Sequence, residues 1–273
     1  MAAKTKKKKT KSKSSAKRKK KPVKRQINKK YAIIIACCLT VVISLIIVAA
    51  VIHNHNNTPA VLDVDKDIAY GIDVSHYNGK IDWDTVAENV DFAFIRVGYR
   101  GYSNGSVNID KKAKYNLKNA NKSGVPVGVY FYSQATNDEE AIEEAEFVLD
   151  KIKGYDVTLP VVIDFEYAYS NGKITGRLHD ADLNKKDRTS LINAFCKTVK
   201  SAGYTPAMYA STYIYESHIN VDDLDKDIVI WVADYNESIT YDGEFDIWQY
   251  SEKGKCEGID SKYVDTNYWY LGK

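Results

Sequence analysis

Short apolar segments alternate with amphipathic segments along most of the chain, between about residues 70 and 270. The apolar segments are rich in β-branched and aromatic residues, which favours strands. They fall at 70–75, 92–99, 125–133, 159–166, 205–211, 228–235, 245–251 and 263–269. The amphipathic segments predict helices, which fall at 82–90, 110–124, 138–155 and 187–204. This alternation predicts βα units around a parallel sheet, and the number of strands predicts a closed barrel.

The spacing of the strands changes near the C-terminus. After residue 228 the gaps between predicted strands are too short for full helices, so we expect the last part of the barrel to be irregular. The predicted fold class is therefore α/β, as an irregular (β/α) TIM-like barrel that follows a single transmembrane helix.

The N-terminal part has a different composition from the rest of the chain. Residues 1–30 carry sixteen Lys or Arg and no acidic residue, and residues 31–52 carry no charge. A helix of roughly 20 apolar residues spans a bilayer, and the basic flank predicts that the N-terminus stays inside. A cleaved signal peptide is the alternative, because Val48 and Ala50 fit a small-residue cleavage site. The long uninterrupted span favours an uncleaved anchor.

The predicted organisation has four parts. These are a basic cytoplasmic tail at 1–30, a signal-anchor helix at 31–52, a linker at 53–69 and the barrel at 70–273. Without the sixteen basic residues of the tail, 23 basic residues remain against 36 acidic ones, which leaves a charge near −13. The tail could in principle neutralise the phosphates of nucleic acid. The adjacent span instead favours an orientation signal that contacts anionic lipid headgroups.

Two carboxylates end the predicted strand LPVVIDFE at 159–166. Asp164 and Glu166 lie two residues apart, so on a strand their side chains share one face, about 7 Å apart at the backbone. Hydrolysis of a glycosidic bond needs two carboxyl groups, one to protonate the leaving oxygen and one to stabilise the developing cation. A D-x-E pair alone is common at strand ends, so its weight depends on the surrounding residues.

Other polar residues fall where the remaining strands of the barrel end. In a (β/α) barrel the catalytic groups gather at the carboxyl ends of the strands. Read in this way, the ends carry Asp73, Tyr132, Tyr209, Asp234, Gln249, Tyr250 and Asp265. Several carboxylates in one mouth raise the pKa of at least one of them, which suits a general acid. Calcium binding is the alternative, but strand-end acids among aromatic residues fit a sugar cleft better, and we expect no metal and no cofactor.

Aromatic and amide side chains supply candidates for substrate binding, because aromatic faces stack on sugar rings and polar tips bind hydroxyl groups. The candidates are His76, Tyr132, Tyr167, Tyr209, Trp231 and Gln249. A structural role for His76 stays open, since no Ser or Cys nucleophile motif accompanies it. Arg96 lies in the middle of a predicted strand, where an ion pair with a barrel carboxylate is as plausible as a binding role.

Ordered motifs over nearly the whole domain resemble a known family. GIDVSHYNGKIDW at 71–83 precedes FAFIRVGYRG, GVPVGVYFYS, LPVVIDFE, MYAS, IWVADY, IWQYS and VDTNYW. This series resembles the glycoside hydrolase family 25 lysozymes, which are Chalaropsis-type muramidases. The resemblance implies cleavage of the β-1,4 bond that follows N-acetylmuramic acid in peptidoglycan. Carried over by position, the essential acids of the family fall on Asp73, Asp164, Glu166 and Asp265, with Glu166 in the place of the proton donor.

One segment departs from the family pattern. Many relatives have a Lys and a Ser/Thr-Glu-Gly turn where this chain has RVGYRG, so one wall of the cleft is expected to differ. No wall-binding repeat is recognisable, so the anchor is expected to provide localisation.

The resemblance implies peptidoglycan glycan strands as partner, together with the membrane through residues 31–52 and no nucleic acid. We expect a monomeric catalytic domain outside a bacterial cell membrane, with the N-terminus in the cytoplasm. Another N-acetylhexosaminidase or a chitinase-like glycosidase is an alternative, although family 18 chitinases usually place an Asp where this chain has Val162. A wall-binding scaffold is a further alternative, against which the four acids argue.

Overall fold

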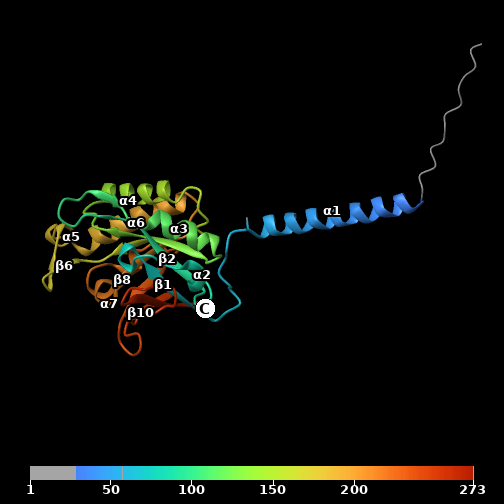
Figure 1. Cartoon of the computed structure of the whole chain (residues 1–273). Helices are drawn as coiled ribbons and strands as arrows, with labels where there is room; N and C mark the ends of the chain where they lie inside the picture. The colour runs from blue at the N-terminus through green and yellow to red at the C-terminus, as the bar shows by residue number, and fades with distance from the viewer. Residues whose placement is uncertain (1–28, 57, 273) are drawn as a thin grey trace, which may run out of the picture. The chain divides into compact units, whose positions relative to one another are not determined.

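The structure of the protein is a computed structural model that describes residues 29–56 and 58–272. The chain divides into two compact units, residues 1–55 and residues 56–273 (Figure 1). In the first unit, the uncharged segment lies within one helix, α1 (Lys29–Asn56). The rest of the predicted basic tail, residues 1–28, lies outside the described residues.

None of the helices in the described ranges combines the length and the apolar character that crossing a membrane requires. The residues predicted to form a helix, 31–52, do lie within helix α1. The role of this helix as a membrane anchor stays a prediction.

The second unit contains the predicted barrel. Its strands pair in the order β1 (Ile68–Val74), β2 (Phe92–Arg100), β4 (Val127–Ser133), β5 (Val161–Phe165), β8 (Pro206–Ser211), β9 (Val229–Ala233), β10 (Ile247–Gly254) and β11 (Val264–Tyr270). Strand β11 pairs back with β1 and closes the ring. Each strand predicted from the sequence is confirmed, with ends that differ from the predicted ones by no more than three residues. A short strand, β3 (Val107–Ile109), extends the sheet antiparallel to β2.

The direction of the last strand differs from the expected parallel arrangement. The first seven strands of the ring, β1, β2, β4, β5, β8, β9 and β10, run parallel to their neighbours, whereas β11 runs antiparallel to both β10 and β1. The nine residues between β10 and β11 are too few for the crossover that a parallel neighbour needs. As a result, Asp265 near the beginning of β11 lies beside Asp73 near the end of β1, and the two residues are paired in the register.

Helices cover the outside of the first two thirds of the barrel, as predicted. They are α2 (Trp83–Val86), α3 (Ala113–Lys122), α4 (Asp138–Lys151) and α6 (Lys185–Ser201). Figure 1 shows α3, α4 and α6 along one side of the strands, and α4 packs against α6.

The sequence did not predict the excursion after β5, which contains the hairpin of β6 (Ala168–Ser170) and β7 (Lys173–Thr175) and the turn of α5 (Arg177–Asp180). It also did not predict α7 (Thr212–Ser217), η1 (His76–Asn78) or η2 (Val221–Asp223).

Alternation along the strands divides the inside of the barrel into two levels. The lower level is an apolar cluster that includes Phe92, Phe94 and Trp231, with the rings of Phe94 and Trp231 4.6 Å apart. The upper level is polar, because Phe94, Val162, Ala207 and Ile247 of this cluster are followed two residues later by Arg96, Asp164, Tyr209 and Gln249. The apolar cluster therefore acts as a floor beneath a polar mouth.

Candidate active site

A cavity of about 760 Å³ opens at the carboxyl ends of the parallel strands, and we call it the cleft. Its lining includes the four acids that the sequence singled out: Asp73, Asp164, Glu166 and Asp265. Asp164 lies on the inner face of β5, and Glu166, two residues later and just beyond the strand, also lines the cleft. The antiparallel β11 brings Asp265 beside Asp73. The structure thus brings together acids that are almost 200 residues apart in the chain.

The carboxyl group of Asp164 is buried near the end of β5. Burial, with the negative charge of Glu166 as a second cause, raises its pKa well above the ordinary value. Its Oδ1 atom has no hydrogen-bond partner among residues 58–272. A buried acceptor without a partner is costly to a fold, so this oxygen is poised to bind a group from outside the protein.

Glu166 follows the last residue of β5 and lines the cleft. Burial raises the pKa of Glu166 to about 7, and the charge of Asp73 acts in the same direction while Arg96 opposes it. Near neutral pH this carboxyl group therefore carries a proton in a large share of the molecules, as a general acid requires.

Two buried amides hold Asp73 in place. The side chains of Gln249 and Asn267 each donate a hydrogen bond to Asp73 Oδ2 over 2.9 Å. The indole N–H of Trp231 fixes the orientation of Asn267 by donating to its Oδ1 atom over 2.9 Å. Burial raises the pKa of Asp73 to about 6, although the two amide hydrogen bonds favour its charged form. This arrangement favours Asp73 as the ionised member of the cluster.

The orientation of Gln249 is fixed from the other side. The hydroxyl groups of Tyr209 and Tyr235 both donate to Gln249 Oε1, over 2.8 and 2.6 Å. The amide nitrogen of Gln249 must therefore face Asp73, which makes the two tyrosines part of the same hydrogen-bonded chain.

Asp265 completes the acidic cluster. Burial raises the pKa of Asp265 to about 8, and the charges of Asp73 and Glu252 add to the effect. Four carboxyl groups in one partly closed cavity repel one another when ionised, so they share protons at neutral pH. The cluster can therefore supply both a proton donor and a negative charge.

Five of the six candidates for substrate binding line the cleft: His76, Tyr132, Tyr209, Trp231 and Gln249. Trp231 belongs largely to the floor, since its ring is only 1% exposed. Tyr167 is not among the lining residues. It is buried, and its hydroxyl lies 3.3 Å from His218 Nδ1.

His76 and Arg96 meet at one wall of the cleft. Arg96 forms an ion pair with Asp110, a buried residue between β3 and α3, and not with a carboxylate of the barrel. His76 Nδ1 lies 2.8 Å from Asp110 Oδ2 and 2.8 Å from Arg96 Nη2. This trio has the contacts of a structural unit, while His76 and Arg96 both still face the cleft.

Asp234, another acid at a strand end, is not among the lining residues of the cleft. Its carboxylate accepts hydrogen bonds from the main chain and hydroxyl of Thr240, at 2.7 and 2.6 Å, and from Asn236. Burial acts to raise the pKa of Asp234, but these hydrogen bonds outweigh it and lower the pKa. Asp234 thus holds the loop that follows β9.

Several residues of the site were missed by the sequence reasoning. Tyr130 lines the cleft and Asn267 donates to Asp73. Each lies two residues from a predicted site residue on the same strand, so the period of two could have found them. Tyr235 lies in a loop and Tyr169 in the short strand β6, and neither segment carries a periodic apolar signal. Within residues 29–56 and 58–272, no group of three or more His, Cys, Asp or Glu side chains is arranged to hold a metal ion.

Known proteins resemble this chain in sequence and in fold. The autolysin LytC from Streptococcus pneumoniae, solved with a synthetic peptidoglycan ligand, is 29% identical with a TM-score of 0.63, over 74% of this chain and 47% of LytC. A family 25 glycosyl hydrolase from Bacillus anthracis is 27% identical with a TM-score of 0.59, over 78% of this chain and 94% of that protein. Lysozyme M1 from Streptomyces globisporus is 26% identical over 211 residues, which are 72% of this chain and 66% of that lysozyme.

The chain thus spans about half the length of LytC and about two thirds of Lysozyme M1. The sequence model described as "Glycosyl hydrolases family 25" matches residues 72–259, which include Asp73, Asp164 and Glu166. Together with the closed barrel and its acidic cleft, this match shows that the chain is a glycoside hydrolase and belongs to glycosyl hydrolases family 25.

Proposed function

We propose that this protein is a peptidoglycan muramidase, a lysozyme that cleaves the β-1,4 bond between N-acetylmuramic acid and N-acetylglucosamine. The observation that carries the proposal is the pair Asp164 and Glu166 at the end of β5, inside a cavity that also holds Asp73 and Asp265. The peptidoglycan ligand of LytC and the likeness to Lysozyme M1 support the choice of substrate.

In this proposal Glu166 is the general acid. Its carboxyl group gives a proton to the glycosidic oxygen while the bond from that oxygen to the anomeric carbon breaks. A pKa of about 7 keeps the donor protonated at the start of the reaction.

Asp164 assists the attack on the anomeric carbon. Since Asp164 and Glu166 project from one face of one strand, Asp164 cannot easily reach that carbon itself. The substrate carries its own nucleophile, the oxygen of the 2-acetamido group, as in substrate-assisted glycosidases. Asp164 orients this group by accepting the amide N–H, a role that suits its unpartnered Oδ1 atom. Asp73 and Asp265 support the pair through their charge.

The second step restores the enzyme. Attack by the acetamido oxygen forms a cyclic oxazolinium, and the alcohol leaves with the proton of Glu166. A water molecule then adds to the anomeric carbon and gives its proton to the Glu166 carboxylate, while the acetamido group re-forms. Two displacements give net retention, whereas direct attack by water would give inversion.

The bond that is cut is tested with purified peptidoglycan. After digestion by the full-length chain, borohydride reduction and mass spectrometry are expected to show reduced N-acetylmuramic acid. Reduced N-acetylglucosamine at the new ends would make the enzyme a glucosaminidase and overturn the proposal.

The roles of the acids are tested by isosteric substitution. Glu166→Gln and Asp164→Asn are each expected to lower kcat by about 10²- to 10⁴-fold. Proton NMR of the first product is expected to show the β-anomer. Normal turnover by Glu166→Gln would refute the whole assignment, and an initial α-anomer would refute the acetamido route alone.

We also propose that residues 31–52 anchor the protein in the membrane of a bacterial cell, with the N-terminus in the cytoplasm and a monomeric catalytic domain outside. The uncharged stretch and the sixteen basic residues before it support this topology. Peptidoglycan strands and the membrane are then the partners, and nucleic acid is not.

A further inference from the structure

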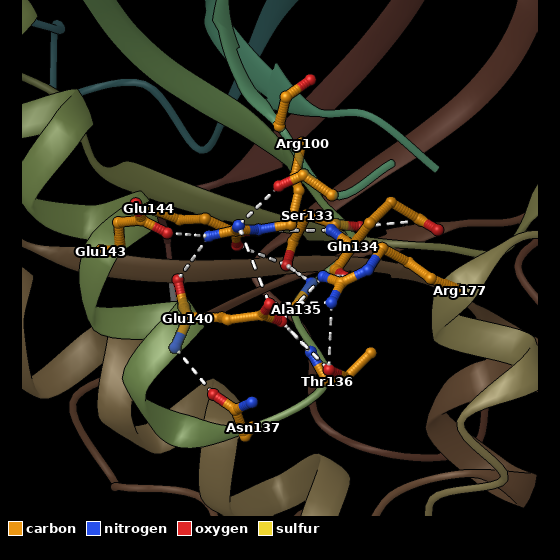
Figure 2. A network of polar contacts seen from close by, with 12 residues as sticks. Arg100, Ser133, Gln134, Ala135, Thr136, Asn137, Glu140, Glu143, Glu144 and Arg177 are labelled. Carbon is orange, nitrogen blue, oxygen red and sulfur yellow. Dashed lines mark hydrogen bonds and ion pairs between the residues drawn. The ribbon is translucent and has the colours of Figure 1, made fainter. Parts of the chain in front are cut away.

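We propose that Gln134 is a positioning residue for Glu166, and that a buried polar network behind the cleft holds it in place. The inference rests on the proposed role of Glu166 as general acid. Gln134 does not line the cleft, and the sequence did not single it out (Figure 2).

The main chain of Glu166 lies beyond the last paired residues of the sheet on both sides of β5. The last pair between β4 and β5 is Ser133 with Phe165, and the last pair between β5 and β8 is Asp164 with Tyr209. Neither ladder therefore fixes the peptide that carries the general acid. Gln134 takes over this task, because its side-chain nitrogen donates to the main-chain oxygen of Glu166 over 2.9 Å.

The same nitrogen also donates to the main-chain oxygen of Ser133 over 2.9 Å. One amide group thus joins the ends of β4 and β5 just above their last ladder pair. Both of its contacts are carbonyl acceptors, which fixes the orientation of the amide with its nitrogen towards them. Gln134 is fully buried, so water does not compete for these hydrogen bonds.

The main chain of Gln134 is itself held on both sides. Its N–H points to Glu144 Oε1 over 3.4 Å, and its carbonyl oxygen accepts from Arg177 Nη1 over 2.8 Å. Figure 2 shows these side chains converging on the segment that follows β4. Arg177 also forms a two-pronged ion pair with Glu140, with both contacts at 2.7 Å.

Glu144 anchors the network to α4 and β2. It is fully buried, and it accepts from Ser133 Oγ over 2.6 Å and from Arg100 Nε over 2.7 Å. Burial raises the pKa of Glu144 to about 7, while the contacts to Ser133 and Arg100 favour its charged form. A buried ion pair of this kind contributes little net stability but fixes geometry firmly.

Gln134 keeps its amide at a cost, because its Oε1 atom is buried without a hydrogen-bond partner among residues 58–272. An apolar side chain of similar volume would avoid that cost, but it would remove the donor that the main-chain oxygens of Ser133 and Glu166 share. The contacts of the amide nitrogen, including the one to the Glu166 peptide, therefore account for an amide at this position.

The test separates proton donation from folding by the choice of leaving group. Gln134→Leu in the full-length chain is assayed on peptidoglycan and on a 2,4-dinitrophenyl β-glycoside of a fragment that ends in N-acetylmuramic acid. Dinitrophenolate leaves without a proton, so a misplaced general acid slows the departure of the leaving group only on peptidoglycan. The parameter compared is kcat/KM, which reports the steps up to that departure and excludes the later attack by water, a step that both substrates share. We expect kcat/KM on peptidoglycan to fall on the order of 10- to 100-fold, with kcat/KM for the dinitrophenyl substrate changed less than about threefold.

Two further variants frame the result. Glu166→Gln is expected to show the same selective loss, more strongly. Asn116→Leu removes another fully buried amide, which bonds to Trp83 on the outside of the barrel, and is expected to keep both reactions. If Gln134→Leu does not fold, Gln134→Met is measured by the same criteria.

The outcomes are distinct. An equal loss on both substrates, or no loss on either, would overturn the positioning role of Gln134. Normal peptidoglycan turnover by Glu166→Gln would instead refute the proposed function itself. A selective loss in Glu166→Gln without one in Gln134→Leu would leave the proposed function intact and refute this inference alone.

Discussion

The carboxylate of Asp73 accepts hydrogen bonds from two buried amides, and each amide is fixed in turn by an aromatic donor. These contacts stabilise a negative charge at Asp73 while the other acids of the cleft are kept partly protonated. Since the charge of Asp73 raises the pKa of Glu166, Asp73 acts on the proposed general acid through the field across the cleft.

This coupling predicts the pH dependence of the reaction. Activity is expected to fall as pH rises through about 7, where Glu166 loses its proton. Asp73→Asn removes a negative charge, so the pKa of Glu166 falls and the alkaline limb moves to lower pH. The measurement is kcat/KM between about pH 4 and 9, for the wild type and for the residual activity of the variant. A limb that stays in place or moves to higher pH would contradict the coupling.

The raised pKa values also predict how stability depends on pH. The pKa of Asp265 rises from an ordinary value of 3.8 to about 8, so the folded state binds a proton that the unfolded state releases. Its contribution to stability is complete below the unfolded pKa and is lost as pH rises towards 8. Asp265→Asn is therefore expected to raise the free energy of unfolding at pH 8 by on the order of 1 kcal/mol.

Urea unfolding at pH 5 and pH 8 checks this expectation, and the gain from the substitution should be small at pH 5. Asp150, an exposed acid remote from the cleft whose pKa is lowered by Lys151 and Lys153, provides the control position. Asp150→Asn is not expected to stabilise the protein at pH 8. A similar gain from both substitutions would point to net charge and not to the cleft.

Sequence reasoning reached the acids of the cleft because all of them lie close to an end of a predicted strand. Asp73 and Asp164 lie near carboxyl ends, Glu166 follows Asp164 at a period of two, and Asp265 lies near the beginning of the last strand. It placed Asp73, Asp164, Glu166 and Asp265 in one mouth, and the cavity contains all four. It missed Gln134 because that residue acts across a loop, through a main-chain oxygen, and no periodic pattern encodes such a contact. The burial of Tyr167 likewise depends on packing against His218, which is 51 residues away in the chain.

At the scale of elements, glycines make room for the aromatic floor. A Cβ atom on Gly128 in β4 would lie 2.2 Å from the ring of Phe94, and one on Gly71 in β1 would lie 2.3 Å from the ring of Phe92. Both rings fill the lower level of the barrel beneath the polar mouth. The small residues on one strand thus match the large residues on its neighbour.

This match predicts the effect of overpacking. Gly128→Ala is expected to lower the free energy of unfolding by about 1–3 kcal/mol, because the floor must shift to admit a methyl group. In Gly128→Ala/Phe94→Leu, the smaller ring-free side chain is expected to recover part of that loss, measured as a coupling energy in a double-mutant cycle. Strictly additive effects of the two substitutions would refute a direct clash.

The direction of β11 shows what the pattern of elements could not predict. The apolar segment at 263–269 predicts a strand in either direction, and the short connection before it indicates irregularity only. Pairing with β1 and β10 is antiparallel, which completes the ring without a crossover helix. The excursion of β6, β7 and α5 was also missed, since its short segments contain many polar residues and lack an apolar period.

At the scale of the whole molecule, charge is divided unequally along the chain. Residues 1–30 carry sixteen basic residues and no acidic residue, and the remainder has a charge near −13 from 23 basic and 36 acidic residues. An acidic domain is repelled by anionic wall polymers, and a basic tail is attracted to anionic headgroups at the inner membrane surface. The attraction of the tail favours the topology proposed above, with the barrel on the far side of the membrane from the tail. The repulsion predicts that the barrel is not held at the wall by charge alone.

Protease protection in intact cells without a wall tests that topology. With one epitope before residue 30 and another after residue 272, added protease is expected to remove the C-terminal epitope and spare the N-terminal one. Detergent should expose both epitopes, which controls for intrinsic resistance of the tail.

Replacing ten basic residues of the tail by Gln is expected to weaken this orientation, because positive charge next to a span keeps its flank inside. Full protection of the C-terminal epitope in intact cells would refute an outside domain, and its release into the medium without protease would show that the anchor is cleaved.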